Sequence, residues 1–304
     1  MPQRRDAASG AVLAMVVATM LWGATFIMVR DTLHGISPLA LVATRFGLAS
    51  FAWALVLLAR RALGFRASGV RQAILGGLAS TPFTAGGYIF QTIGLSSTSA
   101  GSSAFLTSTG TLMTAFIAWP LLGIRPGRRL VLGVGLAAVG SALLSLRSDL
   151  LLGRGEAWTL LGALVYAFQI VIVAPWAAQG ADPWIMVAVQ TVGTAAIAFP
   201  FTHDFMAQIA GLQPAAWSRF AYLVVAGAVI APLLQVIAQR SLPPGRVALL
   251  FALEPVFALL FALVLGGERF VLRWWIGAAL ILAGVISVEA RFEPRRSSSR
   301  SATG

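Results

Sequence analysis

The sequence has no cysteine, no lysine and only two histidines, His34 and His203. The absence of cysteine excludes disulfides, thiolate metal ligands and a cysteine nucleophile. Both histidines fall between long apolar runs, so they do not supply the paired spacing of a histidine metal site. We therefore expect neither a metal nor a cofactor. The sequence contains neither a Ser/His/Asp set nor a phosphate-binding glycine loop, so no catalytic motif indicates an enzyme.

Charged side chains are also scarce. They make up 11% of the chain, against 58% hydrophobic residues, whereas an ordinary soluble domain has about 25% charged residues. A soluble protein of this composition could not cover its surface with polar groups, so the composition predicts a polytopic protein of the lipid bilayer. The net charge of +12 comes from arginines placed between apolar runs. That placement is typical of membrane topology and does not indicate a nucleic-acid partner.

Apolar runs bounded by arginine, proline, glycine or polar clusters predict an all-α fold with ten transmembrane helices. The predicted spans are residues 10–29, 38–59, 72–91, 100–123, 129–146, 156–178, 184–201, 219–239, 246–265 and 271–289. With the N-terminus in the cytoplasm, fifteen arginines lie on the cytoplasmic side, six on the other side and Arg45 inside the second span. This asymmetry predicts a multi-pass protein of the bacterial inner (cytoplasmic) membrane with both termini cytoplasmic. Residues 1–9 then form a short tail and residues 291–304 a disordered one.

An internal repeat divides the chain into two halves, residues 10–147 and 156–290. The halves match at an offset of 144, or of 145 in one segment; the matches include Trp22 with Tyr166, Gln91 with Gln235, Gly101 with Gly245 and Pro38 with Pro183. Five spans in each half is an odd number, so the second half enters the membrane from the opposite side. Two inverted five-helix repeats suit alternating access. Duplication retained only for packing is the alternative, and channels also contain repeats.

Three segments of the chain resemble a known family. The first half contains LWGATFIMVR and TSAGSSAFLTSTGTLMTAFIAWPLLGIRPGRR, and the second ends in GRVALLFALEPVFALLFALVLGGERF. These segments are similar to the EamA repeats of the drug/metabolite transporter superfamily, over residues 10–290. The resemblance implies ten helices in two inverted halves, a central cavity and export of small metabolites from bacteria. Within the superfamily, the chain is most similar to YddG-like exporters of aromatic amino acids.

Polar and aromatic side chains inside the spans are the candidate substrate-binding residues, because a polar group there costs free energy unless it meets a partner or water. We predict that they line the central cavity, and the alternative for each is helix packing. The candidates are Trp22, Thr25, Tyr88, Gln91, Thr107, Tyr166, Gln169 and Gln235.

Glu254 lies in the segment FALEPVF and is the only carboxylate well inside a predicted span. Pro255 follows it, bends the helix and leaves a carbonyl near Phe251 without its donor. One interpretation is a cavity site for a substrate ammonium group or a coupling proton. The other, which the sequence favours, is a protonated acid hydrogen-bonded to a neighbouring helix to hold the kink. The first half has Gly110-Thr111 at the equivalent place, so an acid role would belong to one half only.

Three further features concern the interior of the bundle. Arg45 lies about 10 Å into the membrane and is expected to snorkel to the interface; pairing with a carboxylate of the protein or the substrate is the alternative. Pro82 and Pro232 each free a backbone carbonyl one turn earlier. The small residues of the last span in each half are predicted to mediate packing within the chain or at a dimer contact. They are Gly133, Gly135, Gly140, Gly277 and Gly284.

These observations predict a secondary transporter that exports small metabolites by alternating access. Amino acids with aromatic or other neutral side chains are the first expected substrates, followed by toxic compounds. A multidrug or cation exporter of the same fold and a channel-like facilitator are the alternatives. The expected partners are a small-molecule substrate and the lipid bilayer, and the sequence leaves both a monomer and a homodimer open.

Overall fold

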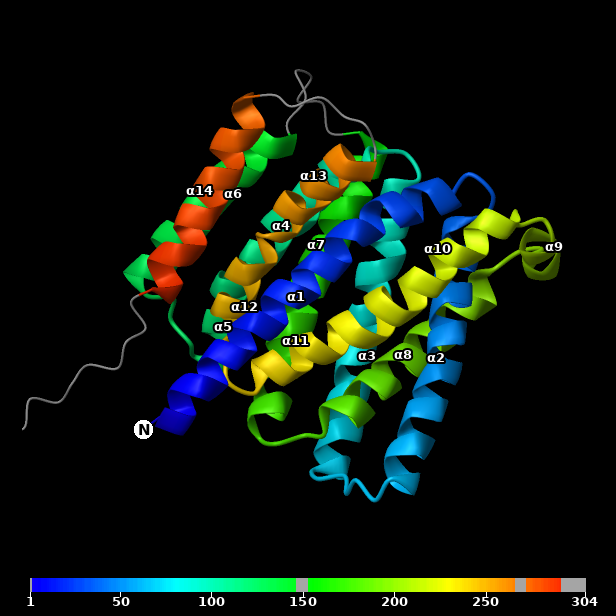
Figure 1. Ribbon diagram of the computed structural model, residues 1–304, viewed down its shortest axis with the longest axis horizontal. Helices are drawn as coiled ribbons and strands as arrows, with labels where there is room; N and C mark the ends of the chain where they lie inside the picture. The colour runs from blue at the N-terminus through cyan, green and yellow to red at the C-terminus, as the bar shows by residue number, and fades with distance from the viewer. Residues whose placement is uncertain (1, 146–152, 266–271, 291–304) are drawn as a thin grey trace, which may run out of the picture.

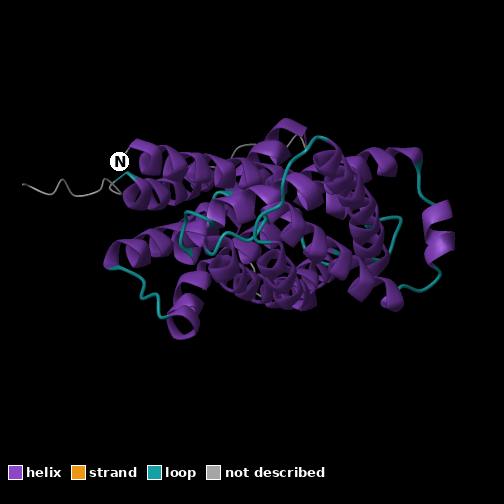
Figure 2. Cartoon of the chain, turned by 90° about the horizontal axis from the view of Figure 1, so that it is seen from below, coloured by secondary structure: helices purple, strands orange, loops and turns teal. Residues whose placement is uncertain are grey.

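A computed structural model describes residues 2–145, 153–265 and 272–290, and this part of the chain is built of helices joined by loops (Figures 1 and 2). The predicted tail 291–304 lies outside the described residues. The helices are α1 (Pro2–Thr32), α2 (Pro38–Ala62), α3 (Val70–Leu95), α4 (Ala100–Leu112), α5 (Thr114–Leu122), α6 (Arg128–Ser145), α7 (Arg154–Ala178), α8 (Pro183–Ala198), the 3₁₀-helix η1 (Phe199–Phe201), α9 (Phe205–Ala210), α10 (Pro214–Val224), the π-helix η2 (Val225–Ile230), α11 (Ala231–Gln239), α12 (Pro244–Phe251), α13 (Glu254–Leu265) and α14 (Leu272–Glu289).

Eight stretches of the described residues are helical, long and apolar enough to cross a membrane. They are Ala8–Thr32, Pro38–Ala62, Ala100–Leu122, Arg154–Ala178, Pro183–Phe201, Pro214–Gln239, Pro244–Phe261 and Leu272–Glu289. The predicted spans 72–91 and 129–146 coincide with the helices α3 and α6, which do not belong to this set. The all-α membrane fold is confirmed, and the number of ten spans stays a prediction.

The fourth span of each half consists of two helical segments instead of one. In the first half α4 ends at Leu112 and α5 begins at Thr114, and in the second half α12 ends at Phe251 and α13 begins at Glu254. At the second break, Ala252 and Leu253 donate to carbonyls three residues back instead of four. A tightened turn of this kind is expected ahead of Pro255, because proline cannot donate the next helical hydrogen bond.

The helix contacts have the pattern of a two-fold relation between the halves. The pairs α3–α7 and α1–α11 exchange when the first half is mapped onto the second, as do α5–α7 and α1–α13. The pairs α2–α8 and α6–α14 each map onto themselves. In Figure 1, α6 and α14 lie side by side at one edge, and α1 crosses the face of the bundle beside α11 and α12.

Glycines allow the close contact between α6 and α14. A Cβ atom on Gly133 would stand 3.0 Å from the carbonyl oxygen of Gly284, and one on Gly140 would stand 2.5 Å from that of Gly277. Side chains at these positions would force the two backbones apart. These four glycines therefore mediate helix packing within the chain, which is one of the two roles predicted for them. The position of Gly135 differs, because its Cβ would meet no atom within 4 Å.

The second helix of each half begins in the same way. Ser37 and Asp182 precede Pro38 and Pro183, and both adopt an extended conformation in which the side chain caps the helix. Asp182 Oδ1 accepts hydrogen bonds from the backbone N–H groups of Trp184 and Ile185, at 2.9 and 3.3 Å. A capping side chain followed by proline at the first helical position is a strong helix start.

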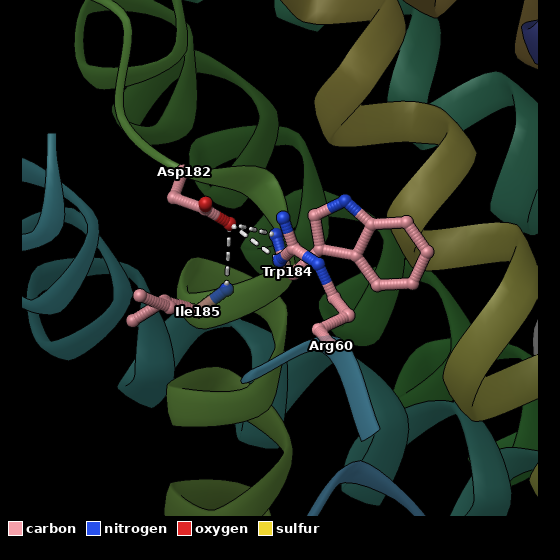
Figure 3. Close-up of polar contacts among 4 residues, drawn as sticks. All are labelled: Arg60, Asp182, Trp184 and Ile185. Carbon is pink, nitrogen blue, oxygen red and sulfur yellow. Dashed lines mark hydrogen bonds and ion pairs between the residues drawn. The ribbon is translucent and has the colours of Figure 1, made fainter. Parts of the chain in front are cut away.

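Asp182 also connects the two halves, as Figure 3 shows. Arg60, near the end of α2, donates from Nη1 to Asp182 Oδ1 at 3.3 Å. Its guanidinium group lies 4.6 Å from the ring centroid of Trp184 (Figure 3). The end of α2 is thereby fastened to the start of α8 by a charge pair and a cation–π contact.

Candidate functional site

A small cavity lies between the two halves, where α1, α3, α4, α7 and the break between α12 and α13 meet. Seven of the sequence candidates line it: Trp22, Thr25, Tyr88, Gln91, Thr107, Tyr166 and Glu254. Gly87, Gly162, Ala163 and Phe251 complete its wall. Its volume of about 30 Å³ holds roughly two water molecules. It is far smaller than the roughly 300–1,000 Å³ of ligand pockets, so the described conformation encloses no space for a metabolite.

Four aromatic rings form one side of this cavity. The ring of Trp22 stacks on that of Phe251 with centroids 5.1 Å apart, and Tyr166 meets both rings edge-on. Tyr88 meets Tyr166 edge-on at 5.9 Å. Stacked and edge-to-face arrangements are those that aromatic quadrupoles favour. The rings come from α1, α3, α7 and α12, so the wall depends on both halves of the chain.

A backbone carbonyl of the second half orients the two rings that come from the first half, Trp22 and Tyr88. Ala231 donates its N–H to Ala226, five residues back, which is the π-helical pattern. The next donor in this pattern would be residue 232, which is proline, so the carbonyl of Gly227 is left without a helical partner. The indole N–H of Trp22 donates to this carbonyl at 3.1 Å, and the hydroxyl of Tyr88 at 3.5 Å.

The glutamines near the cavity occupy two different positions. Gln91 lines the cavity and donates from Nε2 to the hydroxyl of Thr107 at 2.9 Å. Gln235, its repeat partner, lies behind the wall, where Oε1 accepts a hydrogen bond from the hydroxyl of Tyr166 at 2.9 Å. Gln235 Nε2 in turn donates to Gln169 Oε1 at 3.0 Å. Gln169 and Gln235 are therefore not among the cavity-lining residues, and they support Tyr166 through hydrogen bonds.

Glu254 is buried, and its side chain lines the cavity. Its Oε2 atom has no hydrogen-bond partner within the described part of the chain. This oxygen fits a cavity site for an ammonium group or a proton, and the role of Glu254 stays a prediction. At the repeat-equivalent position, a Cβ atom on Gly110 would overlap Ala163 of α7. Close packing of α4 on α7 therefore leaves no room for a second acid in the first half.

Arg45 does not snorkel, and that expectation was wrong. The residue is 3% exposed. Nε donates to the carbonyl of Leu223 in α10 at 3.2 Å, and the guanidinium group lies 4.9 Å from the ring centroid of Tyr88. Contacts with α10 and η2 hold the arginine inside the bundle, because Gly227 has no side chain to occupy that space.

A polar vestibule of about 450 Å³ lies at one end of the same helices. Arg30, His34, Glu156 and the hydroxyl-rich segment 96–99 line it. The hydroxyl of Thr98 donates to Glu156 Oε1 at 2.5 Å. Glu156 precedes Tyr166 by ten residues on α7, so the vestibule and the aromatic wall lie about 15 Å apart along this helix.

The opposite end of the cavity is closed by packed side chains. Met15, Val247, Leu249 and Leu250 belong to one buried cluster there, each fully shielded. The guanidinium group of Arg246 also forms a two-point ion pair with Glu289, with Nε and Oε1 2.9 Å apart. The cavity is thus separated from one face of the bundle by a dense layer and lies beneath a vestibule at the other.

The sequence did not identify Phe251 as part of this region, and for Arg45 it favoured snorkelling over a place inside the bundle. Phe251 is one of many apolar residues in its span, and only the break between α12 and α13 directs attention to it. Arg45 carried a signal, a charge inside a span, that was given the wrong interpretation. The small residues Gly87, Gly162 and Ala163 form the wall through their backbones, which side-chain chemistry does not reveal.

Comparison with known proteins gives one family. The model of the EamA-like transporter family matches residues 9–146 and again residues 153–289. A curated relative from Archaeoglobus fulgidus, described as an uncharacterized transporter, is 27% identical over 279 residues, which cover 92% of this chain and 85% of the relative.

A solved structure, titled only as the crystal structure of a protein, has a TM-score of 0.72 at 19% identity. The match covers 93% of this chain and 97% of that one, and it shows a shared fold. The two family matches coincide with the two halves found in the sequence. The chain therefore belongs to the EamA-like transporter family of the drug/metabolite transporter superfamily and is a multi-pass membrane transporter.

Proposed function

We propose that this protein exports small amphipathic metabolites, and amino acids with aromatic or other neutral side chains in particular, across the bacterial inner membrane by alternating access. The observation that carries the proposal is the cavity itself. Four aromatic rings and Glu254, whose Oε2 atom has no partner in the described part of the chain, enclose a site between two repeat-related halves. An aromatic wall suits a flat apolar side chain, and a carboxylate suits an ammonium group.

The two faces of the bundle support the alternating-access part of the proposal. The vestibule carries Arg30 and Glu156, which the arginine asymmetry assigns to the non-cytoplasmic side, and the packed layer carries Met15 and Leu250. The described conformation then corresponds to a site closed toward the cytoplasm, with both termini on that side. Since the halves exchange under the two-fold relation, the reverse arrangement of their contacts would close the vestibule and open the cytoplasmic side.

A transport assay in proteoliposomes tests the proposal. Purified protein is reconstituted and supplied with labelled phenylalanine or tryptophan, and uptake is measured against empty liposomes. A carrier shows saturable uptake, and vesicles preloaded with the unlabelled amino acid accelerate entry of the label. Uptake that rises linearly with concentration and shows no such counterflow identifies a channel-like facilitator instead. No uptake across a panel of neutral amino acids refutes the substrate class.

A second candidate, an exporter of organic cations, is favoured by the same acid. Glu254 is the carboxylate that lines the cavity, and aromatic rings attract cations through their faces. This candidate predicts transport of aromatic amines that carry no carboxylate. A panel containing phenylethylamine beside phenylalanine separates the two candidates.

A further inference from the structure

Arg45 is a buried cation, and no acidic residue in the described part of the chain forms an ion pair with it. It belongs to neither of the ion pairs Arg60–Asp182 and Arg246–Glu289. Its Nη2 atom has no hydrogen-bond partner among the described residues, although it is fully buried. An arginine inside the hydrocarbon region is expensive, and a cation–π contact with Tyr88 offsets only part of the cost.

The internal repeat shows whether helix packing at this position requires a positively charged side chain. The repeat partner of Arg45 is Gln190, at the offset of 145 that also relates Pro38 to Pro183. Gln190 is buried and donates from Nε2 to the hydroxyl of Ser80 in α3 at 2.7 Å. In the first half, Arg45 donates to the carbonyl of Leu223. The repeat offset of 144 maps Leu223 onto residue 79, which is the neighbour of Ser80. A neutral amide therefore makes the same interhelical bridge in the other half, so the bridge does not explain a positive charge.

The unpartnered nitrogen lies directly behind the cavity wall. A Cβ atom on Gly227 would stand 2.5 Å from Arg45 Nη2 and 2.9 Å from Cγ2 of Thr25. Thr25 and Tyr88 both lie close to the guanidinium group and both line the cavity. The guanidinium group of Arg45 lies 4.9 Å from the ring centroid of Tyr88, and Glu254 lines the same cavity as Tyr88 and Tyr166. A positive and a negative side chain thus flank one pair of tyrosines.

We propose that Arg45 binds the carboxylate of the transported substrate, and this inference rests on the proposed function as an amino-acid exporter. A guanidinium group presents a rigid fork of donors that fits a carboxylate. Nε is engaged with Leu223, which leaves Nη2 to donate to the substrate. The cavity must widen to admit any metabolite, and the ring of Tyr88, held by a long 3.5 Å hydrogen bond, is the part that separates Arg45 from it.

The test compares amino acids with analogues that lack the carboxylate charge. Binding of phenylalanine and tryptophan, and of their carboxamides, is measured by thermal shift and by competition for uptake. The wild-type protein should prefer each acid over its amide by about 10- to 100-fold, which is the range of a hydrogen bond to a charged group. In Arg45→Gln, which copies Gln190 and keeps the bridge to Leu223, the acid should lose this advantage while amide binding stays within about threefold. Arg45→Lys should retain part of the preference.

Each outcome has a defined meaning. An unchanged ratio of acid to amide binding in a folded Arg45→Gln protein overturns the role of Arg45 and leaves the exporter proposal standing. Should Arg45→Gln fail to fold, the wild-type ratio decides, because equal binding of acid and amide overturns the inference without any variant. Binding of neither phenylalanine nor tryptophan by the wild-type protein, together with a silent neutral amino-acid panel, refutes the proposed function and the inference with it.

Discussion

Gly162 lies where α7 touches α3, and replacing it with alanine should separate the two helices at the cavity wall. The new Cβ would stand 2.8 Å from the backbone nitrogen of Gln91, 3.0 Å from the carbonyl oxygen of Gly87 and 3.3 Å from the carbonyl carbon of Phe90. Ordinary contacts between such atoms begin near 3.5 Å, so the backbones must move apart by roughly 0.7 Å. Because the obstructing atoms belong to the backbone, no rotamer change can relieve the overlap.

Gly47 provides the matched control for this prediction. It also lies inside a helix, and its Cβ would meet no atom within 4 Å. Both substitutions gain about 0.5–1 kcal/mol from the loss of glycine in a helix, and this gain cancels when the variants are compared. The remaining difference is the cost of overpacking, about 1–3 kcal/mol.

Thermal unfolding in detergent is the assay for this pair of variants. Gly47→Ala should unfold at or above the wild-type temperature, and Gly162→Ala below Gly47→Ala. Gly162→Ala should also raise the KM of transport, since displacement of Gln91 disturbs its hydrogen bond with Thr107. Equal unfolding temperatures of the two variants would show that α3 and α7 do not approach as closely as the geometry states, and would refute the reasoning.

Three further predictions concern polar contacts. Tyr166→Phe removes the hydroxyl that donates to Gln235 and keeps the ring, so stability should fall by about 1 kcal/mol; unchanged thermal stability would mean that this bond contributes nothing. Glu254→Gln keeps the shape of the side chain but not its charge, so it should abolish uphill, proton-driven uptake and weaken exchange between labelled and unlabelled substrate; full uphill transport would remove Glu254 from proton coupling. Arg60→Gln and Asp182→Asn, measured singly and together, should show a coupling of up to about 1 kcal/mol, because Arg60 remains 21% exposed; the coupling should shrink in high salt, and strictly additive effects would argue against an ion pair.

The sequence predicted the membrane class, the repeat and most of the cavity because these depend on local and periodic signals. An aromatic or polar residue in a span is visible without knowledge of its neighbours, and the offset of 144 indicated that Trp22 and Tyr166 occupy related places. Which glutamine faces the cavity was not predictable. Gln91 and Gln235 are repeat partners, yet only one lines the cavity, because the rotation of each helix depends on what packs behind it.

Helix irregularities account for other differences between prediction and structure. Pro232 was expected to free the carbonyl one turn earlier, at residue 228. The π-helix between Val225 and Ile230 shifts the pattern by one residue, so the carbonyl of Gly227 is the one that accepts from Trp22 and Tyr88. A π-helix depends on tertiary contacts that reward the extra residue, and hydropathy carries no sign of them.

The carbonyl of Gly227 gives the two halves of the transporter a mechanical linkage. It holds the rings of Trp22 and Tyr88, which belong to the first half, from a segment of the second half whose hydrogen-bond register is irregular. If η2 returned to α-helical register, this oxygen would turn about the helix axis and both rings would lose their common acceptor at once. A change in the backbone of the second half would then change the shape of the part of the wall that the first half contributes, through these two hydrogen bonds.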